Sequence, residues 1–229
     1  MKVTGLLPIS LIDYPGILAA VIFTQGCNFR CPFCHNPELI PFNNDELIPE
    51  KEIFSFLNKR VGKLDGVSIT GGEPLLQKDL SGFIKQIQHL GFKVKLDTNG
   101  SNPELLRDLV EEGNLDFIAM DIKTSRENYS RAIGVDFDIS KITQSIEIVK
   151  QFKKYEFRIT SVPGLVDEDD ITRIREWLAP AKTIVLQQFI NKKTFADEYQ
   201  ELKPYPQSKL KEFKLILDSK IDNVKIRGF

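Results

Sequence analysis

The chain has 229 residues, of which 41% are hydrophobic and 28% are charged, and its net charge is −1. This balance is typical of a soluble globular domain and lacks the basic excess of nucleic-acid-binding surfaces, so we expect no nucleic-acid partner. A chain of this length buries roughly 70% or more of its unfolded surface, enough for one sizeable core. Residues 1–229 are therefore expected to form a single domain.

The N-terminal residues 1–26 are fairly apolar, but Pro8, Asp13 and Pro15 interrupt them before the ~20 apolar residues of a membrane span accumulate. We expect neither a signal peptide nor a membrane partner. All three cysteines lie within residues 27–34, too close together for the disulfide framework of a secreted protein. The pattern favours a reducing compartment, the cytoplasm.

Six segments rich in β-branched or aromatic residues predict buried strands, and helical patterns lie between them. The strands are expected at residues 19–24, 66–70, 92–97, 116–122, 156–161 and 183–189. The helices are expected at residues 49–60, 79–90, 103–112, 139–153, 168–178 and 207–219. Pro49 and Pro103 suit first-turn positions. The part from about residue 190 to 229 is the least informative, although its tail DNVKIRGF could form an edge strand.

The strand-helix alternation predicts an α/β fold with parallel strands and right-handed crossovers, either a doubly wound open sheet or an incomplete barrel. In both architectures the loops that follow the strands meet at one rim, where the chemistry is expected. The unusual residues of this sequence follow the first five strands in turn, as QGCNFRCPFCHNP, GGEP, TNGSNP, DIKT and SVPG.

The cysteines stand at Cys27, Cys31 and Cys34, in one loop expected at residues 25–38. A structural zinc ion normally takes four protein ligands, and His35 is adjacent to Cys34 and poorly placed to be the fourth. A four-iron cluster also prefers four ligands, so three cysteines would leave one iron open to a small molecule. A zinc loop that binds a partner remains an alternative.

The cysteine loop resembles that of the radical S-adenosylmethionine (SAM) superfamily, in which an aromatic residue, here Phe33, precedes the third cysteine. Gly71, Gly72, Glu73 and Pro74 match the GGEP motif of the same superfamily. The resemblance implies an incomplete (β/α)6 TIM-like barrel with a [4Fe–4S] cluster on the three cysteines. SAM would bind the open iron and be cleaved reductively to methionine and a 5′-deoxyadenosyl radical.

Within the superfamily, the leader SLIDYPG and the segment IAMDIKT resemble the glycyl-radical-enzyme activating enzymes, and in particular the anaerobic ribonucleoside-triphosphate reductase activating proteins. The resemblance implies that one cluster serves to install a glycyl radical on a partner such as anaerobic ribonucleotide reductase, with a flavodoxin or ferredoxin as electron donor. The alternative is a radical SAM enzyme that acts on a small metabolite, similar to the deazaguanine synthases.

The resemblance also implies roles by motif position. The adenine side of SAM would be lined by Phe33, Cys34 and His35, and its amino end would be held by Gly71, Gly72 and Glu73. Other contacts would come from Thr98, Asn99, Asp121, Lys123 and Arg158. A monovalent cation would be held by Asp97, Thr98 and Asp121.

For several of these residues, a purely structural role is an alternative to a contact with SAM. Asp121 and Lys123 could form a plain ion pair, because a lysine at the end of a buried strand is costly unless it is paired or ligand-bound. Arg158 could stack or pair within the protein, and Asn99 could simply bond to its own turn. Some activating enzymes place a histidine after the sixth strand, where this chain offers only Gln187 or Gln188.

Overall fold

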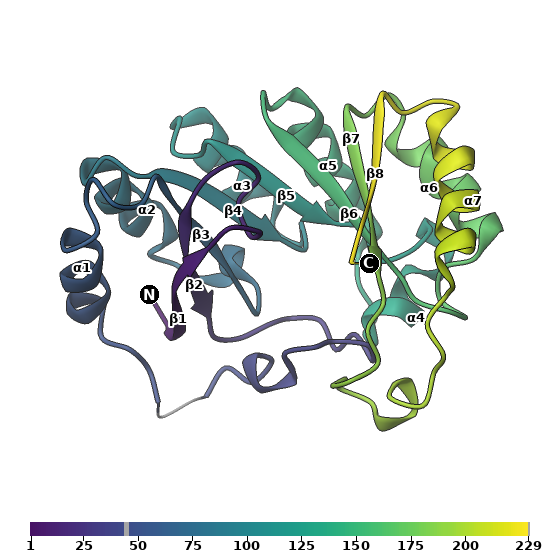
Figure 1. Cartoon of the computed structure of the whole chain (residues 1–229), viewed down its shortest axis with the longest axis horizontal. Coiled ribbons are helices and arrows are strands. Elements are labelled where there is room, and N and C mark those ends of the chain that lie inside the picture. The colour runs from purple at the N-terminus through teal and green to yellow at the C-terminus, as the bar shows by residue number, and fades with distance from the viewer. Residues whose placement is uncertain (44–45, 229) are drawn as a thin grey trace.

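The computed structural model of the chain describes residues 1–43 and 46–228. One eight-stranded sheet, in the order β1 to β8, runs through it (Figure 1). Its strands are β1 Val3–Ser10, β2 Ala19–Thr24, β3 Gly66–Gly71, β4 Lys93–Thr98, β5 Phe117–Asp121, β6 Tyr155–Ser161, β7 Thr183–Gln188 and β8 Asn223–Arg227. Strands β2 to β8 pair in parallel, and β1 pairs antiparallel to β2.

The six expected helices are present with shifts of at most a few residues at their ends. The helices of the structure are α1 Glu50–Asn58, α2 Leu80–His89, α3 Pro103–Glu111, α4 Tyr129–Ile133, α5 Ile139–Gln151, α6 Glu168–Leu178 and α7 Gln207–Asp218. Pro103 opens α3 as expected, whereas Pro49 precedes α1 as its N-cap residue. Within residues 1–43 and 46–228, no helix combines the length and apolar character needed to cross a bilayer.

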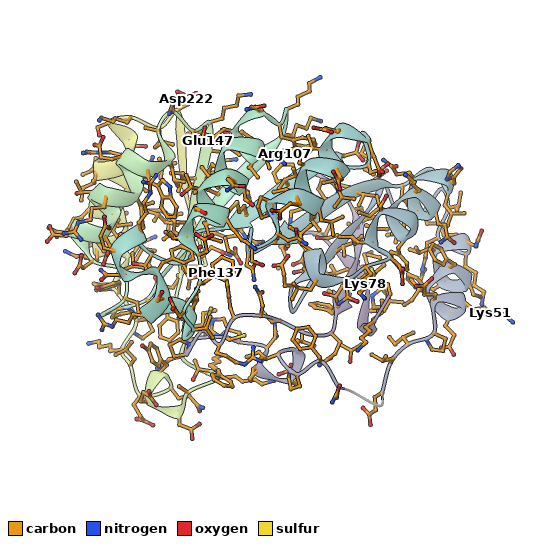
Figure 2. All side chains as sticks on the ribbon, turned by 180° about the vertical axis from the view of Figure 1, so that it is seen from behind. Lys51, Lys78, Arg107, Phe137, Glu147 and Asp222 are labelled. Atoms are coloured by element: carbon orange, nitrogen blue, oxygen red, sulfur yellow. The ribbon has the colours of Figure 1, made fainter. Side chains whose placement is uncertain are left out.

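The strand order decides between the two architectures that the sequence allowed. A doubly wound sheet reverses its strand order at a switch point, whereas these strands follow one another in chain order. Figure 1 shows the curved sheet with its helices along the outer side, and Figure 2, from behind, shows that helical side with Arg107 of α3 and Glu147 of α5 in its upper part. The fold is the expected incomplete TIM-like barrel.

The prediction of six strands was wrong in number, because β1 and β8 extend the sheet at its two ends. Gly5 and Pro8 fall inside β1, and such residues argue against a central strand but are tolerated at a sheet edge. The tail expected as an edge strand does form β8, although Phe229 lies outside the described residues.

The two faces of the curved sheet differ in chemistry because side chains alternate along each strand. The outer face packs its apolar residues against the helices, among them Val67, Ile69, Val94, Leu96, Ile118, Met120, Phe157, Ile159, Ile184 and Leu186. The inner face carries buried polar side chains instead, including Ser68, Lys95, Asp97 and Glu156. The barrel interior is therefore the polar part of the molecule, and it opens at the rim where the strands end.

Candidate active site

A cavity of about 320 Å³ lies where the carboxyl halves of β2 to β7 meet the loops that follow them. Every residue that the sequence placed in the site lines it: Cys27, Cys31, Phe33, Cys34, His35, Gly71, Gly72, Glu73, Asp97, Thr98, Asn99, Asp121, Lys123 and Arg158. Gln187 lines it as well, together with Asp13, which the sequence analysis did not consider as a site residue. The structure thus brings the expected site together in one place.

The cysteine loop is closed by its own backbone. Gly26 N donates to Leu39 O over 2.8 Å, and Cys27 N donates to Ile40 O over 3.0 Å. Phe33 is buried within the hydrophobic core, which anchors the loop between the second and third cysteines. The closed loop therefore holds the three thiols on one wall of the cavity.

The environment of the three thiols suits metal ligation better than free reactivity. Burial raises the pKa of Cys27 to about 11 and that of Cys31 to about 12, and it raises the pKa of Cys34 as well. Such thiols are inert at neutral pH, and thiolates form here only beside compensating positive charge, which a metal centre supplies. In the described ranges, no three His, Cys, Asp or Glu side chains are arranged to hold a single metal ion. Three thiols that line one cavity match the three-cysteine donor set of a four-iron cluster with one open iron.

Gly71, the last residue of β3, and Gly72, which follows it, are required by the protein's own backbone. Gly72 N donates to Thr24 O over 2.9 Å, and Glu73 N donates to Gly26 O over 2.8 Å. A Cβ atom on Gly72 would collide with the carbonyl oxygen of Gly26, and Gly71 has a φ of +116°, which side-chain-bearing residues rarely adopt. The GGEP turn is thereby fastened to the start of the cysteine loop.

We expect Gly72→Ala to destabilise the protein by about 3 kcal/mol, because the added methyl group meets backbone that has no room to move. The free energy of unfolding in urea measures the effect. Gly82→Ala is the matched control, since a Cβ atom on Gly82 in α2 meets nothing within 4 Å, and it should stabilise the protein by about 0.5–1 kcal/mol. Equal stability of Gly72→Ala and the wild type would contradict the close packing of the two loops.

Glu73 joins the second loop to the third. Its carboxylate is 1% exposed and accepts hydrogen bonds from Thr98 Oγ1 over 2.6 Å, Asn99 N over 2.6 Å and Leu75 N over 3.0 Å. Burial raises the pKa of Glu73 to about 7, although these donors oppose the rise. With its oxygens turned to protein donors, Glu73 shapes the wall of the cavity, and a direct contact to SAM stays a prediction.

Asn99 makes the turn hydrogen bond that the sequence allowed, and its contact to SAM stays a prediction. Its Oδ1 accepts from Ser101 N over 2.9 Å, as a turn asparagine does. Its Nδ2 donates to Asn28 Oδ1 over 3.1 Å and lies 4.0 Å from Cys27 Sγ. Asn28, which the sequence analysis passed over, therefore links the third loop to the cysteine loop.

Charged side chains from three neighbouring strands meet below the cysteines. Arg158 Nη1 donates to Asp97 Oδ2 over 2.9 Å, and Arg158 Nε donates to Asp121 Oδ1 over 2.8 Å. Lys123 Nζ donates to Asp121 Oδ2 over 3.0 Å, so the ion pair considered from the sequence is present. Burial opposes ionisation of Asp121, but Arg158 and Lys123 outweigh it and hold its pKa well below the ordinary value.

The segment after β7 covers the cysteine loop. Ala196 N donates to Pro32 O over 2.9 Å, and the ring of His35 stacks on Phe189 with centroids 6.0 Å apart. In Figure 1 this segment, coloured yellow-green, and the dark-blue loop after β2 both run along the lower edge of the molecule. The part of the chain that the sequence left least defined therefore helps to build the site.

Gln187 and Gln188, the two candidates for the missing histidine, point in different directions. Gln187 lines the cavity, whereas Gln188 Nε2 donates to Tyr205 O over 3.0 Å, outside the cavity lining. Of the two, only Gln187 is placed to meet a ligand.

The incomplete barrel and the three-cysteine cavity define an α/β enzyme of the SAM-cleaving type, and the comparison with protein families agrees. The model described as Radical SAM superfamily matches residues 21–178. The chain belongs to this superfamily and is a radical SAM enzyme, with a [4Fe–4S] cluster and SAM as its cofactors.

Among its relatives is a Methanocaldococcus jannaschii protein provisionally named a glycyl-radical enzyme activating enzyme, 34% identical over 98% of this chain and 95% of the relative. The pyruvate formate-lyase-activating enzyme of Streptococcus mutans is 27% identical over 90% of this chain and 84% of its own. The crystal structure of Streptococcus suis SuiB bound to S-adenosylmethionine superposes with a TM-score of 0.69 at 16% identity. It covers 91% of this chain, which spans 50% of SuiB, and the likeness concerns the fold alone.

Proposed function

We propose that this protein cleaves SAM reductively and uses the resulting radical to remove a hydrogen atom from a glycine of a partner enzyme, such as anaerobic ribonucleotide reductase. One observation carries the proposal: the expected ligands for the cluster and for SAM, which come from five separate stretches of sequence, line a single cavity. The sequence similarity to activating enzymes over nearly the whole chain supports the choice of a glycyl-radical enzyme as the partner.

The chain's own residues have distinct tasks in this proposal. Cys27, Cys31 and Cys34 hold the cluster, whose low-potential electron is what makes SAM cleavage accessible when both cofactors are bound. The residues around them would orient SAM: the adenine side by Phe33, Cys34 and His35, the amino end by Gly71, Gly72 and Glu73, and the remainder by Thr98, Asn99, Asp121, Lys123 and Arg158. The buried charges and the covering segment after β7 exclude bulk water from the cavity.

Access for a partner is favoured by the incomplete barrel. The sheet ends at β1 on one side and at β8 on the other, so a flexible glycine-bearing loop has a lateral route to the rim. The electron would come from a flavodoxin- or ferredoxin-type donor, and a cytoplasmic site of action suits three cysteines that are all unpaired.

The test uses the anaerobically reconstituted protein, a chemical reductant, SAM and each glycyl-radical enzyme encoded beside it in the host genome. We expect a glycyl-radical signal in electron paramagnetic resonance, with one SAM consumed per radical formed. A partner variant whose radical glycine is replaced by alanine is the control and should give no signal. Many turnovers on a small metabolite, with no protein radical, would overturn the proposal and favour an enzyme similar to the deazaguanine synthases.

A further inference from the structure

A lysine is buried in the barrel interior next to a proposed site carboxylate. Lys95 and Asp97 lie two residues apart on β4, so both side chains point to the inner face of the sheet. Lys95 is 2% exposed and Asp97 is 8% exposed, and Lys95 Nζ donates to Asp97 Oδ1. An ammonium this deeply buried is rare unless it is paired.

Lys95 completes a set in which every carboxylate oxygen accepts from a positive charge. Asp97 Oδ1 accepts from Lys95, and Asp97 Oδ2 and Asp121 Oδ1 both accept from Arg158. Asp121 Oδ2 accepts from Lys123. Three basic side chains thus bond the four oxygens of two carboxylates.

The other acidic groups near the set have partners of their own. Glu156, on β6, is paired with Arg227, whose Nη1 and Nη2 lie 3.2 Å from its two carboxylate oxygens. Glu73 accepts from three uncharged donors, Thr98 Oγ1, Asn99 N and Leu75 N. Asp97 is the hydrogen-bonded partner of Lys95.

A monovalent cation, which the resemblance implies at Asp97, Thr98 and Asp121, does not fit these residues. Each oxygen of Asp97 and Asp121 already accepts from a basic side chain, and these donors would repel a metal ion at short range in a buried site. Thr98 Oγ1 is also engaged, since it donates to Glu73 over 2.6 Å.

We propose that Lys95 is a positioning residue that supplies to Asp97 the positive charge that a monovalent metal ion would otherwise bring. Its ammonium fixes Asp97, and through Arg158 it also fixes Asp121, so that the protein binds SAM without a sodium or potassium ion. The inference rests on the proposed function only in taking SAM as the ligand of the cavity. Its core statement, that Lys95 replaces a metal cation as the partner of Asp97, concerns the protein alone.

The first test needs neither cluster nor SAM. The thermal unfolding midpoint is measured in potassium, sodium and choline chloride at equal ionic strength, which keeps general screening constant. We expect the wild type to unfold at the same temperature in all three salts. Lys95→Ala opens space beside Asp97, and potassium or sodium should raise its midpoint relative to choline. Lys93→Ala, which removes an exposed lysine from the same strand, should show no such difference.

The second test measures SAM binding to the reconstituted protein in the same salts. Lys95→Ala should bind SAM about tenfold more weakly in choline, because Asp97 loses a charged hydrogen-bond donor, and potassium or sodium should restore the affinity. A merely structural role would not produce rescue by a specific cation. If Lys95→Ala does not fold, Lys95→Met, which fills the space, should fold and bind SAM weakly in every salt.

Either of two results would overturn the proposal: a wild type whose unfolding or SAM affinity depends on potassium or sodium, or a Lys95→Ala protein indifferent to the salt. The comparison of the wild type in the three salts shows whether the protein needs a sodium or potassium ion, even if no variant folds. If the wild type binds no SAM in any salt, the proposed function fails, while the unfolding comparison still tests Lys95.

Discussion

Cys31→Ala is expected to yield a folded protein that retains little iron after anaerobic reconstitution and forms no 5′-deoxyadenosine from SAM after reduction. The three cysteines are the only thiols of the chain, so the variant leaves a cluster with two protein ligands, too few to hold four irons. Stability should fall by only about 1–2 kcal/mol, because the lost sulfur leaves a small apolar cavity. Iron content, the 5′-deoxyadenosine assay and urea unfolding measure the three effects.

The other two cysteines provide the comparison. Cys27→Ala and Cys34→Ala should lose iron and SAM cleavage to the same extent as Cys31→Ala, because in the proposed function each cysteine supplies one of three equivalent ligands. A variant that kept a full iron complement would remove its cysteine from the ligand set. If the wild type held zinc in place of iron, the three cysteines would be better explained as a zinc loop that binds a partner.

The regular part of the fold could be predicted because its strands and helices carry strong local patterns. The bounds of β2 and of α6 agree with the sequence prediction at both ends. In α6, Asp167 and Asp170 form a reciprocal capping box, which fixes the start of the helix locally. The edge strand β1 could not be predicted in this way, because Gly5 and Pro8 are acceptable only after its position at the edge is known.

The site could be predicted to the extent that its residues follow strand ends, since parallel strands bring those ends to one rim. Lys95 was not predicted as a site residue because its proposed role depends on Arg158, which sheet register brings from β6 to Asp97 and Asp121. The sequence did contain an indication of this role, because Lys95 lies two residues before Asp97 in a predicted buried strand. A lysine in such a place is costly unless it is paired, which is the argument that drew attention to Lys123. The covering segment after β7 carried no signal, because its contacts to Pro32 and His35 are purely tertiary.

Arg158→Met is expected to destabilise the protein by about 3–5 kcal/mol, since it breaks a buried ion-pair network by removing one partner. Arg158 is the only side chain that bonds both Asp97 and Asp121 among the hydrogen bonds of the described residues. Arg173→Met is the matched control, because the ion pair of Arg173 with Glu127 is exposed and 3.8 Å long. Such a surface pair contributes about 0–1 kcal/mol. Equal costs for the two variants would contradict a special role for Arg158.

Acid should reduce the difference in the free energy of unfolding between Arg158→Met and the wild type. The positive neighbours hold the pKa of Asp97 and of Asp121 below the ordinary 3.8 against the opposing effect of burial. Groups with depressed pKa stabilise the folded state above their ordinary pKa, and this stabilisation is lost as the pH falls through the folded value. The wild type should therefore lose more stability than Arg158→Met below a pH of about 4. Urea unfolding across this range measures both curves.

Arg158→Lys separates charge from geometry in the same experiment. Arg158 uses Nε for one carboxylate and Nη1 for the other, and its planar guanidinium fixes the angle between the two bonds. A lysine ammonium keeps the charge but is a single point on a flexible stem, so it cannot place donors at both positions. We expect Arg158→Lys to recover the acid dependence of the wild type in part and SAM cleavage hardly at all. Full recovery of both would mean that the site needs a positive charge between Asp97 and Asp121 and no particular geometry.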